Sequence, residues 1–199
     1  MISTQRCAQL GLGAAGVVLA SCLSVLFAYS PKNEPIVVAP TGDFIPAFHL
    51  KDLDGQTYDS AALHGKATVI FFTSVHCTTC GDYQDRVADL ARKYVGDPRV
   101  QFLALNQDLS DGDQQRLLEV RVFSKVSNRP FPTLLDTGGK TATRFGAKPA
   151  QFAVVDADGA IRYVGGFDDN RDAKKVKRQY VAEQLRQVVE EIPAAVASR

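Results

Sequence analysis

The feature that most constrains the fold is an apolar run followed closely by two cysteines. Residues Thr68–Phe72 are β-branched or aromatic, and Cys77-Thr-Thr-Cys80 comes shortly after them. A continuous run of this kind is typical of a strand that is covered on both faces. Such a strand lies in the middle of a sheet with helices on both sides. The sequence therefore predicts an α/β fold in which the cysteines follow a central strand.

The residues after the cysteines have helical periodicity. Apolar side chains recur every three or four positions from Tyr83 to Val95, and Gly96 and Pro98 follow them. This spacing predicts an amphipathic helix, and glycine and proline are common where a helix ends. We therefore expect a helix that begins at the cysteine pair and ends near Gly96.

The rest of the domain alternates between strand and helix patterns and ends with a hairpin and a helix. The expected elements are an early hairpin at 47–50 and 56–58, a strand at 100–105, a helix after a capping box of Ser110 and Asp113, an extended piece at 131–136, a brief helix at 141–145, a hairpin at 152–155 and 161–164, and a last helix striped by apolar residues from Val176 to Ile192. Alternation gives parallel strands with crossover helices, and a hairpin adds antiparallel strands. The prediction is a central mixed sheet with helices on both faces.

The N-terminus predicts a membrane anchor or an export signal. No charged residue lies between Arg6 and Lys32, and residues 10–29 are apolar, small or weakly polar. As a helix this stretch would be about 30 Å long, the thickness of the hydrocarbon core of a bilayer. The positive charge before it favours a cytoplasmic Met1 and a domain on the outer side of a bacterial cytoplasmic membrane.

Two other fates of this segment stay open. Leu19-Ala-Ser-Cys22 resembles a bacterial lipobox, in which the cysteine is lipidated, and a simply cleaved signal is the third possibility. The apolar run continues past Cys22, which favours an uncleaved anchor because signal peptides are shorter. All three fates deliver the domain to the extracytoplasmic, periplasmic side. The expected division is an anchor or signal at 1–30, a linker at 31–42, the domain at 43–192 and a tail at 193–199.

Cys77 and Cys80 carry the expected chemistry. A helix N-terminus has partial positive charge and unpaired amide hydrogens, which stabilise a thiolate, and the thiolate is the species that attacks a disulfide. Cys77 at the helix tip is therefore expected to attack, and Cys80 one turn inward to resolve the mixed disulfide. The alternative is half of a zinc site. A closed zinc site needs four ligands, and the domain offers only His49, His64 and His76 beside the pair.

His76 has two interpretations. As a cation beside Cys77 it would lower the pKa of that thiol. As a solvated loop histidine it would have no such effect. The sequence does not decide between them.

Several ordered pieces resemble a known family. They are Pro46-Ala-Phe-His-Leu50, Asp54-Gly55, Gly65-Lys66, the strand with its cysteines, Phe131-Pro-Thr-Leu-Leu-Asp136, Phe145–Asp156, Asp158-Gly159 and Gly165-Gly-Phe-Asp168. In this order they resemble the redoxin/TlpA–ResA group of thioredoxin-like proteins over Pro46–Asn170. The resemblance implies a thioredoxin-like fold with a small insertion.

The resemblance also implies a substrate-binding edge. Pro149 would be a cis-proline facing the cysteines, with the backbone of Lys148 free to pair with an incoming peptide. A plain trans turn at Pro149 is the alternative. Lys148 replaces the usual small or β-branched residue and could add positive charge near Cys77. His76 stands where the group has tryptophan, and Thr-Thr fills the space between the cysteines.

These observations predict a membrane-tethered thiol–disulfide oxidoreductase. Its partners would be protein thiols or disulfides and an upstream redox protein. It would need no organic cofactor and no metal, because electrons enter and leave through thiols. A net charge of +1 gives no bulk attraction to nucleic acid. A basic cluster at Arg171, Lys174, Lys175, Lys177 and Arg178 is expected to be a solvated face, with lipid-headgroup contact as the alternative.

Two other functions stay as alternatives. Peroxiredoxins resemble one another in Pro-x-x-x-Thr-x-x-Cys, and this chain has Ile70 and Ser74 at the first two fixed places before Cys77. Copper-delivery proteins of the Sco type resemble one another in Cys-x-x-x-Cys with a distant histidine. Here the spacer has two residues and no histidine follows His76.

Overall fold

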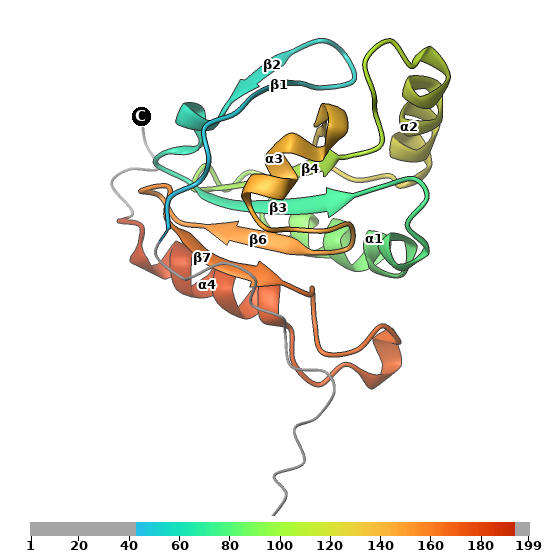
Figure 1. Cartoon of the computed structure of the whole chain (residues 1–199). Helices are drawn as coiled ribbons and strands as arrows, with labels where there is room; N and C mark the ends of the chain where they lie inside the picture. The colour runs from blue at the N-terminus through green and yellow to red at the C-terminus, as the bar shows by residue number, and fades with distance from the viewer. Residues whose placement is uncertain (1–42, 194–199) are drawn as a thin grey trace, which may run out of the picture. The chain divides into compact units, whose positions relative to one another are not determined.

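A five-stranded mixed sheet forms the centre of the computed structural model, which describes residues 43–193 (Figure 1). The strands are β3 (Ala67–Thr73), β4 (Val100–Asn106), β5 (Thr133–Leu135), β6 (Phe152–Val155) and β7 (Ile161–Gly165). Their order is β5-β4-β3-β6-β7. Strand β3 runs parallel to β4, and β4 parallel to β5, whereas β6 is antiparallel to both β3 and β7. The predicted mixed sheet and the central place of the first apolar run are confirmed.

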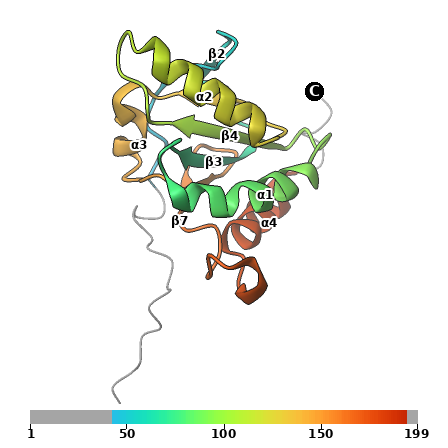
Figure 2. The ribbon, with the colours of Figure 1, turned by 90° about the vertical axis from the view of Figure 1, so that its right-hand side faces the viewer.

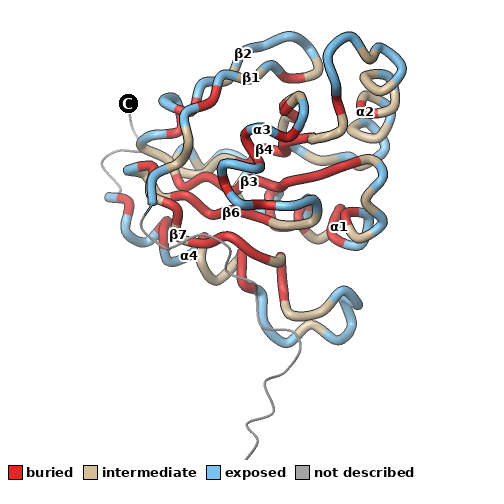
Figure 3. The backbone as a smooth tube through the Cα atoms, viewed as in Figure 1, coloured by how far each residue is buried: buried red, intermediate tan, exposed pale blue. Residues whose placement is uncertain are grey.

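Strand β3 separates two cores. All seven of its residues are buried (Figure 3). Successive side chains of a strand point to opposite faces, so Val69 and Phe71 enter one core while Ile70 and Phe72 enter the other. Phe71 stacks on Phe152 of β6, with ring centroids 4.5 Å apart and the planes 2° from parallel. This explains why the run has no polar face.

Helices cover the two faces unequally. On the Phe71 face lie α1 (Thr78–Arg92) and α4 (Tyr180–Glu191), which share one core cluster. On the opposite face lie the short helix α3 (Lys140–Arg144) and the segment around a hairpin of β1 (His49–Lys51) and β2 (Thr57–Asp59). Figure 2 shows α1 beside α4, with α2 apart from both. The predicted helices on both faces are therefore confirmed.

Helix α2 (Gln114–Val126) connects β4 to β5 and is the least buried of the longer helices. Val120 is its buried residue, whereas Leu118, Val122 and Val126 are exposed. Its Ser124 hydroxyl contacts the Thr133 hydroxyl of β5 at 3.0 Å. Helix α2 thus packs along the sheet mainly by one residue and by polar contacts.

Two predicted helix starts are wrong. Asp113, and not Ser110, is the N-cap of α2, because its carboxylate accepts the backbone N–H of Arg116 at 2.9 Å. Gly112, at φ 80°, turns the chain just before it. Helix α4 begins at Tyr180 and not at Val176, because a 3₁₀ turn at Ala173–Lys175 and extended backbone at Val176 come first.

The predicted anchor at 1–30, with Cys22, and the linker at 31–42 lie outside the described residues, as does most of the predicted tail. Among residues 43–193, the structure contains no helix that is both long and apolar enough to cross a membrane.

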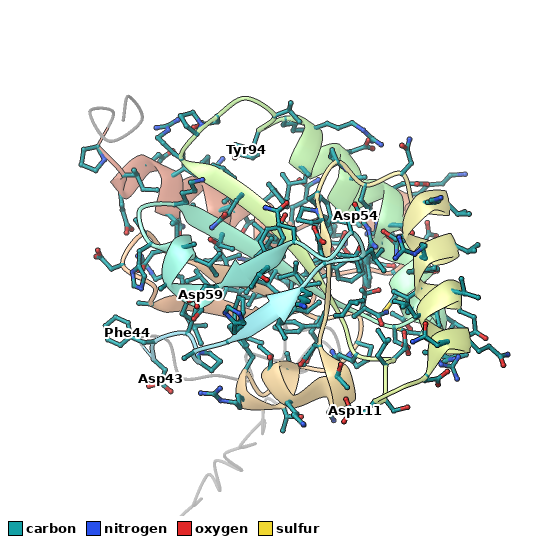
Figure 4. The ribbon with its side chains drawn as sticks, turned by 90° about the horizontal axis from the view of Figure 1, so that it is seen from above. Asp43, Phe44, Asp54, Asp59, Tyr94 and Asp111 are labelled. Carbon is teal, nitrogen blue, oxygen red and sulfur yellow. The ribbon has the colours of Figure 1, made fainter. Side chains whose placement is uncertain are left out.

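The Phe71–Phe152 stack should be a large source of stability. Phe152→Ala removes a fully buried ring from between β3 and α1, and such truncations cost about 3–5 kcal/mol. Phe44→Ala is the matched control, because Phe44 is 69% exposed and projects from the edge of the domain (Figure 4). Urea unfolding should show a large loss of unfolding free energy for Phe152→Ala only. Equal losses of unfolding free energy in the two variants would show that the Phe71–Phe152 stack stabilises the fold no more than an exposed ring does.

Candidate active site

Cys77 caps the helix that follows the central strand. Its backbone is extended, at φ −88° and ψ 101°, and its sulfur accepts the backbone N–H of Cys80 at 3.0 Å. Serine, threonine and aspartate usually fill this role, since a capping atom must accept an N–H bond. The N-terminus of α1 therefore directs its partial positive charge and an amide hydrogen at the Cys77 sulfur.

The two thiols have different surroundings. Cys77 is half-buried, whereas Cys80 is fully buried in the core cluster between α1 and β3. Burial, helped by the neighbouring Cys77, raises the pKa of Cys80 to about 12. The Ser74 backbone and the Thr73 hydroxyl act in the opposite direction. Of these two thiols, Cys77 is thus the one placed to react first with a molecule from solvent.

Asp108 fixes the loop that carries Cys77. Its carboxylate accepts the Ser74 hydroxyl and the Val75 backbone N–H, each at 2.6 Å, and the Asn106 side-chain amide at 2.7 Å. Ser74 in turn accepts the backbone N–H of Cys77 on its carbonyl at 3.2 Å. One carboxylate from the end of β4 therefore holds the turn between β3 and α1.

The ring of His76 faces α2. Its Nε2 contacts the guanidinium of Arg116 and lies 3.9 Å from a Glu119 carboxylate oxygen. Arginine has only donors, so Nε2 acts as the acceptor in this contact. The His76 side chain is 63% exposed. The arrangement places the polar partners of His76 on α2.

The segment at Lys148–Gln151 lies beside the end of β3. The Ala150 N–H bonds to the Phe72 carbonyl at 2.9 Å, and the Phe72 N–H bonds to the Gln151 carbonyl at 3.0 Å. Ala150 and Cys77 both pack against the core cluster that contains Phe71. Lys148 and Pro149 are exposed. The turn thus lies at the end of β3 from which the chain continues to Cys77.

The backbone of Lys148 differs from the expectation. Its N–H bonds to the Gln151 side-chain oxygen at 2.8 Å, and its carbonyl accepts the Gln151 backbone N–H at 3.1 Å. The expectation of a free backbone here was wrong, because Gln151 folds back over the turn. Ala150 has a positive φ of 70°, which L-residues rarely adopt and which is common near active sites.

Arg86 joins α1 to the segment after β7. Its guanidinium pairs with the buried carboxylate of Asp168 and donates to the carbonyls of Asn170 and Arg171, at 3.1 and 2.9 Å. Burial raises the pKa of Asp168, and Arg86 opposes that rise. This contact fixes the start of the predicted basic cluster.

Arg171 is held near the tip of α1. Its Nε donates to Asp82 at 2.7 Å, and this ion pair, with a smaller attraction to Cys77, raises the pKa of Arg171. Lys175 pairs with Asp172, and Arg178 pairs with Glu183. Three residues of the predicted basic cluster are therefore held in ion pairs. One of them, Arg171, lies near the end of α1 that carries Cys77.

The sequence reasoning missed Asp108 and Arg86. A signal existed for Asp108, because polar residues at the ends of adjacent parallel strands meet at one edge of a sheet. No local signal identified Arg86, since its partner Asp168 is far along the chain. For the metal alternative, residues 43–193 contain no group of three or more His, Cys, Asp or Glu side chains that could hold an ion.

Comparisons with known proteins agree with this arrangement. Residues 41–164 match the AhpC/TSA family. The chain belongs to this family. No curated protein matches the sequence. The match spans the sheet, the cysteine pair and the Lys148–Gln151 segment, which is the region in which the redoxin resemblance was found.

Solved structures of the same fold include three bacterial proteins. An uncharacterised conserved protein from Geobacillus kaustophilus aligns with a TM-score of 0.67 and 25% identity, over 81% of this chain and 88% of that one. A putative thiol:disulfide interchange protein DsbE from Chlorobium tepidum gives 0.60 and 20%, over 75% and 98%. A secreted disulfide oxidoreductase from Mycobacterium tuberculosis gives 0.53 and 22%, over 70% and 95%. They establish the thioredoxin-like fold.

The reactivities of the two thiols should differ strongly. With its pKa raised to about 12, on the order of one Cys80 thiol in 10⁵ is ionised at pH 7. Iodoacetamide should therefore modify Cys77 first in the reduced protein and leave Cys80 unmodified until the chain is unfolded. Peptide mass spectrometry after timed alkylation measures this order. Equal labelling of both cysteines in the folded chain would contradict the assigned burial.

The Arg86–Asp168 pair should be important for stability and sensitive to pH. Arg86→Met leaves Asp168 charged, buried and unpaired, which costs about 3–5 kcal/mol. Without Arg86 the pKa of Asp168 rises further, so the folded state binds its proton more tightly than the unfolded state. The stability deficit should therefore grow as pH rises from about 4 to 7.

The control for this pair is Arg86→Met combined with Asp168→Asn. The neutral amide removes the unpaired charge, so the double variant should regain much of the lost stability and lose the pH dependence. Urea unfolding at several pH values measures both. A single variant as stable as the wild-type chain at pH 7 would refute the role of the pair.

Proposed function

We propose that this protein exchanges its Cys77–Cys80 dithiol and disulfide with thiols and disulfides of protein partners. The observation that carries the proposal is the contrast at the start of α1. A half-buried sulfur accepts an N–H from the first turn of the helix, and a second sulfur lies fully buried one turn behind it. The AhpC/TSA membership and the disulfide-exchange proteins that share the fold support it.

Cys77 performs the first step. Its thiolate attacks one sulfur of the partner disulfide, a Cys77–partner S–S bond forms, and the partner S–S bond breaks. The released partner thiolate takes a proton from solvent. The N-terminus of α1 and the nearby Arg171 place positive charge beside the Cys77 sulfur.

Cys80 performs the second step. It loses its thiol proton and attacks the Cys77 sulfur, the Cys77–Cys80 bond forms, and the Cys77–partner bond breaks. The second partner sulfur leaves as a thiolate and takes up a proton, so two electrons pass from the dithiol to the partner. In the reduced protein, the charge and hydrogen bond of Cys77 help to raise the pKa of Cys80. A mixed disulfide at Cys77 removes that charge. Reaction of Cys77 therefore removes one cause of the raised Cys80 pKa, whereas burial, the largest cause, remains.

The exposed turn at Lys148 and Pro149 is the proposed contact for the partner backbone. A partner carbonyl would replace the Gln151 side-chain oxygen on the Lys148 N–H, which costs little because both are neutral acceptors. The ammonium of Lys148 would favour acidic partners. His76, which is exposed beside Cys77, would line the same approach.

The proposed location is outside the cytoplasmic membrane. The apolar stretch at residues 10–29 supports an anchor, and the single charge that precedes it supports an outward-facing domain. An upstream redox protein on that side would restore the dithiol or the disulfide.

Thiol peroxidase is the second candidate, because the AhpC/TSA membership favours it. The residues around Cys77 oppose it. Ile70 is buried in the core of β3, and the Ser74 hydroxyl donates to Asp108. Neither side chain is free to bind a peroxide beside Cys77.

Single-cysteine variants test the proposed exchange. In a full chain with Cys7→Ser and Cys22→Ser, Cys77→Ser should abolish reduction of a protein disulfide, because the attacking sulfur is lost. Cys80→Ser should accumulate a mixed disulfide through Cys77, seen as a reducible adduct by mass spectrometry. Full activity of the Cys77→Ser chain would refute the mechanism. Catalytic consumption of hydrogen peroxide without protein-disulfide reduction would instead support the peroxidase candidate.

A further inference from the structure

A loop between β7 and α4 carries a concentration of positive charge. Residues 169–178 form this basic loop, which contains five cationic side chains and two carboxylates, a net charge of +3, whereas the whole chain carries +1. The basic loop projects from the body of the domain below β7 in Figure 1, and residues 171–175 and 177–178 are exposed (Figure 3). The charge of this protein is therefore distributed unevenly, with an excess of cations on one exposed segment.

The basic loop is closed by its own hydrogen bonds. The Asp169 N–H bonds to the Arg178 carbonyl at 3.1 Å, and the Asp169 carboxylate accepts the Lys177 N–H at 2.9 Å. Inside the loop, the Asp172 carboxylate accepts the Lys174 N–H at 3.0 Å and caps the 3₁₀ turn that follows it. Compact loops whose ends lie close together are often functional. The two acidic side chains thus bind the backbone of the loop and fix its shape.

Arg86 and Arg171 hold the basic loop against α1. The Arg86 guanidinium donates to the Asp82 carbonyl at 3.0 Å within α1. It also donates to the carbonyls of Asn170 and Arg171 in the loop, at 3.1 and 2.9 Å. Arg171 in turn pairs with the Asp82 carboxylate through two nitrogens, at 2.6 and 2.7 Å. Asp82 lies five residues after Cys77, which is about 7.5 Å along the axis of α1. The loop is therefore attached to the end of α1 that carries the proposed nucleophile.

Ion pairs neutralise only part of the charge of the basic loop. Arg171, Lys175 and Arg178 each pair with one carboxylate. Within the described residues, the ammonium groups of Lys174 and Lys177 form no ion pair. Like charges that lie close together repel one another, so the row of cations does not itself stabilise the loop. The positive charge that remains is available to an anionic group that approaches from solvent.

The exposed side chains of the basic loop favour a protein partner over a lipid surface. A segment that binds in a membrane interface inserts apolar side chains beside its cations. The exposed positions of the basic loop hold charged side chains and Ala173, and its larger apolar residue, Val176, is half-buried. Such a surface fits carboxylates on another protein. Because the loop is attached to α1 near Cys77, a protein bound to it would lie close to the reactive sulfur.

We propose that the basic loop is the docking surface for an acidic protein partner of the exchange at Cys77. The proposal rests on the exchange reaction proposed above and specifies the class of partner, which is a protein with Asp or Glu side chains beside its reactive cysteines. Docking adds no chemical step. It raises the rate at which the partner reaches Cys77, because a patch of one sign of charge steers molecules of the opposite sign. The loop thus determines specificity, whereas the two cysteines carry the chemistry.

The effect should be on association and should depend on salt. Electrostatic steering raises association rates by about 10- to 1000-fold. Exposed charges are screened beyond about 8 Å at physiological ionic strength and beyond about 3 Å at 1 M salt. The preference for acidic partners should therefore be large at low salt and nearly absent at 1 M salt. Lys174, Lys175 and Lys177 are the residues to change, because their side chains take no part in holding the loop to α1.

The assay uses the reduced full chain with Cys7→Ser and Cys22→Ser, and two synthetic peptides. Both peptides contain the same internal disulfide, which is flanked by glutamates in one and by lysines in the other. Each rate of reduction is divided by the rate of the same peptide with dithiothreitol, which corrects for intrinsic reactivity. At low salt the corrected rate should be at least about tenfold higher for the glutamate peptide. The triple variant Lys174→Gln, Lys175→Gln, Lys177→Gln should lose most of this preference.

The matched control changes three exposed lysines elsewhere. Lys51, Lys125 and Lys140 lie on β1, α2 and α3, and their replacement by glutamine lowers the net charge by the same amount. This control chain should keep the preference for the glutamate peptide. Equal losses in the control and in the triple variant of the loop would show that net charge, and not the basic loop, selects the partner, and would overturn the proposal.

Cross-linking locates the contact. In the chain with Cys80→Ser, the glutamate peptide should be trapped as a mixed disulfide at Cys77. A carbodiimide, which joins carboxylates to amines, should then link the peptide to Lys174, Lys175 or Lys177, as measured by peptide mass spectrometry. A trapped peptide without a link to these lysines would overturn the docking role.

The outcomes separate the two proposals. No reaction of the parent chain with either peptide would refute the exchange reaction itself. Equal corrected rates with the two peptides would overturn the docking role and leave the exchange reaction intact. Vesicles of phosphatidylglycerol that protect the loop lysines from acetylation, together with no preference between the peptides, would assign the basic loop to lipid headgroups and would also overturn the proposal.

Discussion

The hydrogen bond from the Cys80 backbone to the Cys77 sulfur is the interaction on which the site depends. The bond is both a helix cap and part of the proposed redox site. The Cys77 sulfur accepts one of the otherwise unpaired N–H groups at the start of α1, and the same sulfur is the proposed nucleophile. It forms only if the turn after β3 delivers Cys77 with extended backbone. Asp108 holds that turn, and the burial of β3 on both faces holds the strand before it. A sulfur that enters a disulfide is a weaker acceptor, so the start of α1 and the redox state are coupled.

A network of ion pairs places positive charge near the cysteine pair. Arg171 lies exposed near Cys77 and is held there by Asp82 and by the contacts of Arg86 with the backbone beyond Asp168. This places a positive charge beside the half-buried sulfur that would meet a partner.

Sequence patterns predicted the sheet, the position of the cysteines and the final hairpin, because each is encoded by local periodicity or turn residues. The long-range contacts of the site could not be predicted in this way. Arg86 resembles any surface arginine of an amphipathic helix until Asp168, which lies far along the chain, pairs with it. The backbone of Lys148 was expected to be free, but Gln151 bonds to it through a side-chain rotamer that no pattern encodes. The predicted start of α2 was also wrong, because Ser110 and Asp113 are both good capping residues. In the structure the chain turns at Gly112, and the helix starts after Asp113.

A redox titration of the Cys77–Cys80 pair tests the central claim most directly. The full chain, with Cys7→Ser and Cys22→Ser, is equilibrated in glutathione buffers and the internal disulfide is followed by mass spectrometry. The account predicts a single reversible transition in which a tenfold change in the ratio of oxidised to reduced protein takes about 30 mV, as for two electrons. A potential near about −270 mV would make the protein a reductase, and one near about −120 mV an oxidant. If no Cys77–Cys80 disulfide formed at any potential, the account would be contradicted.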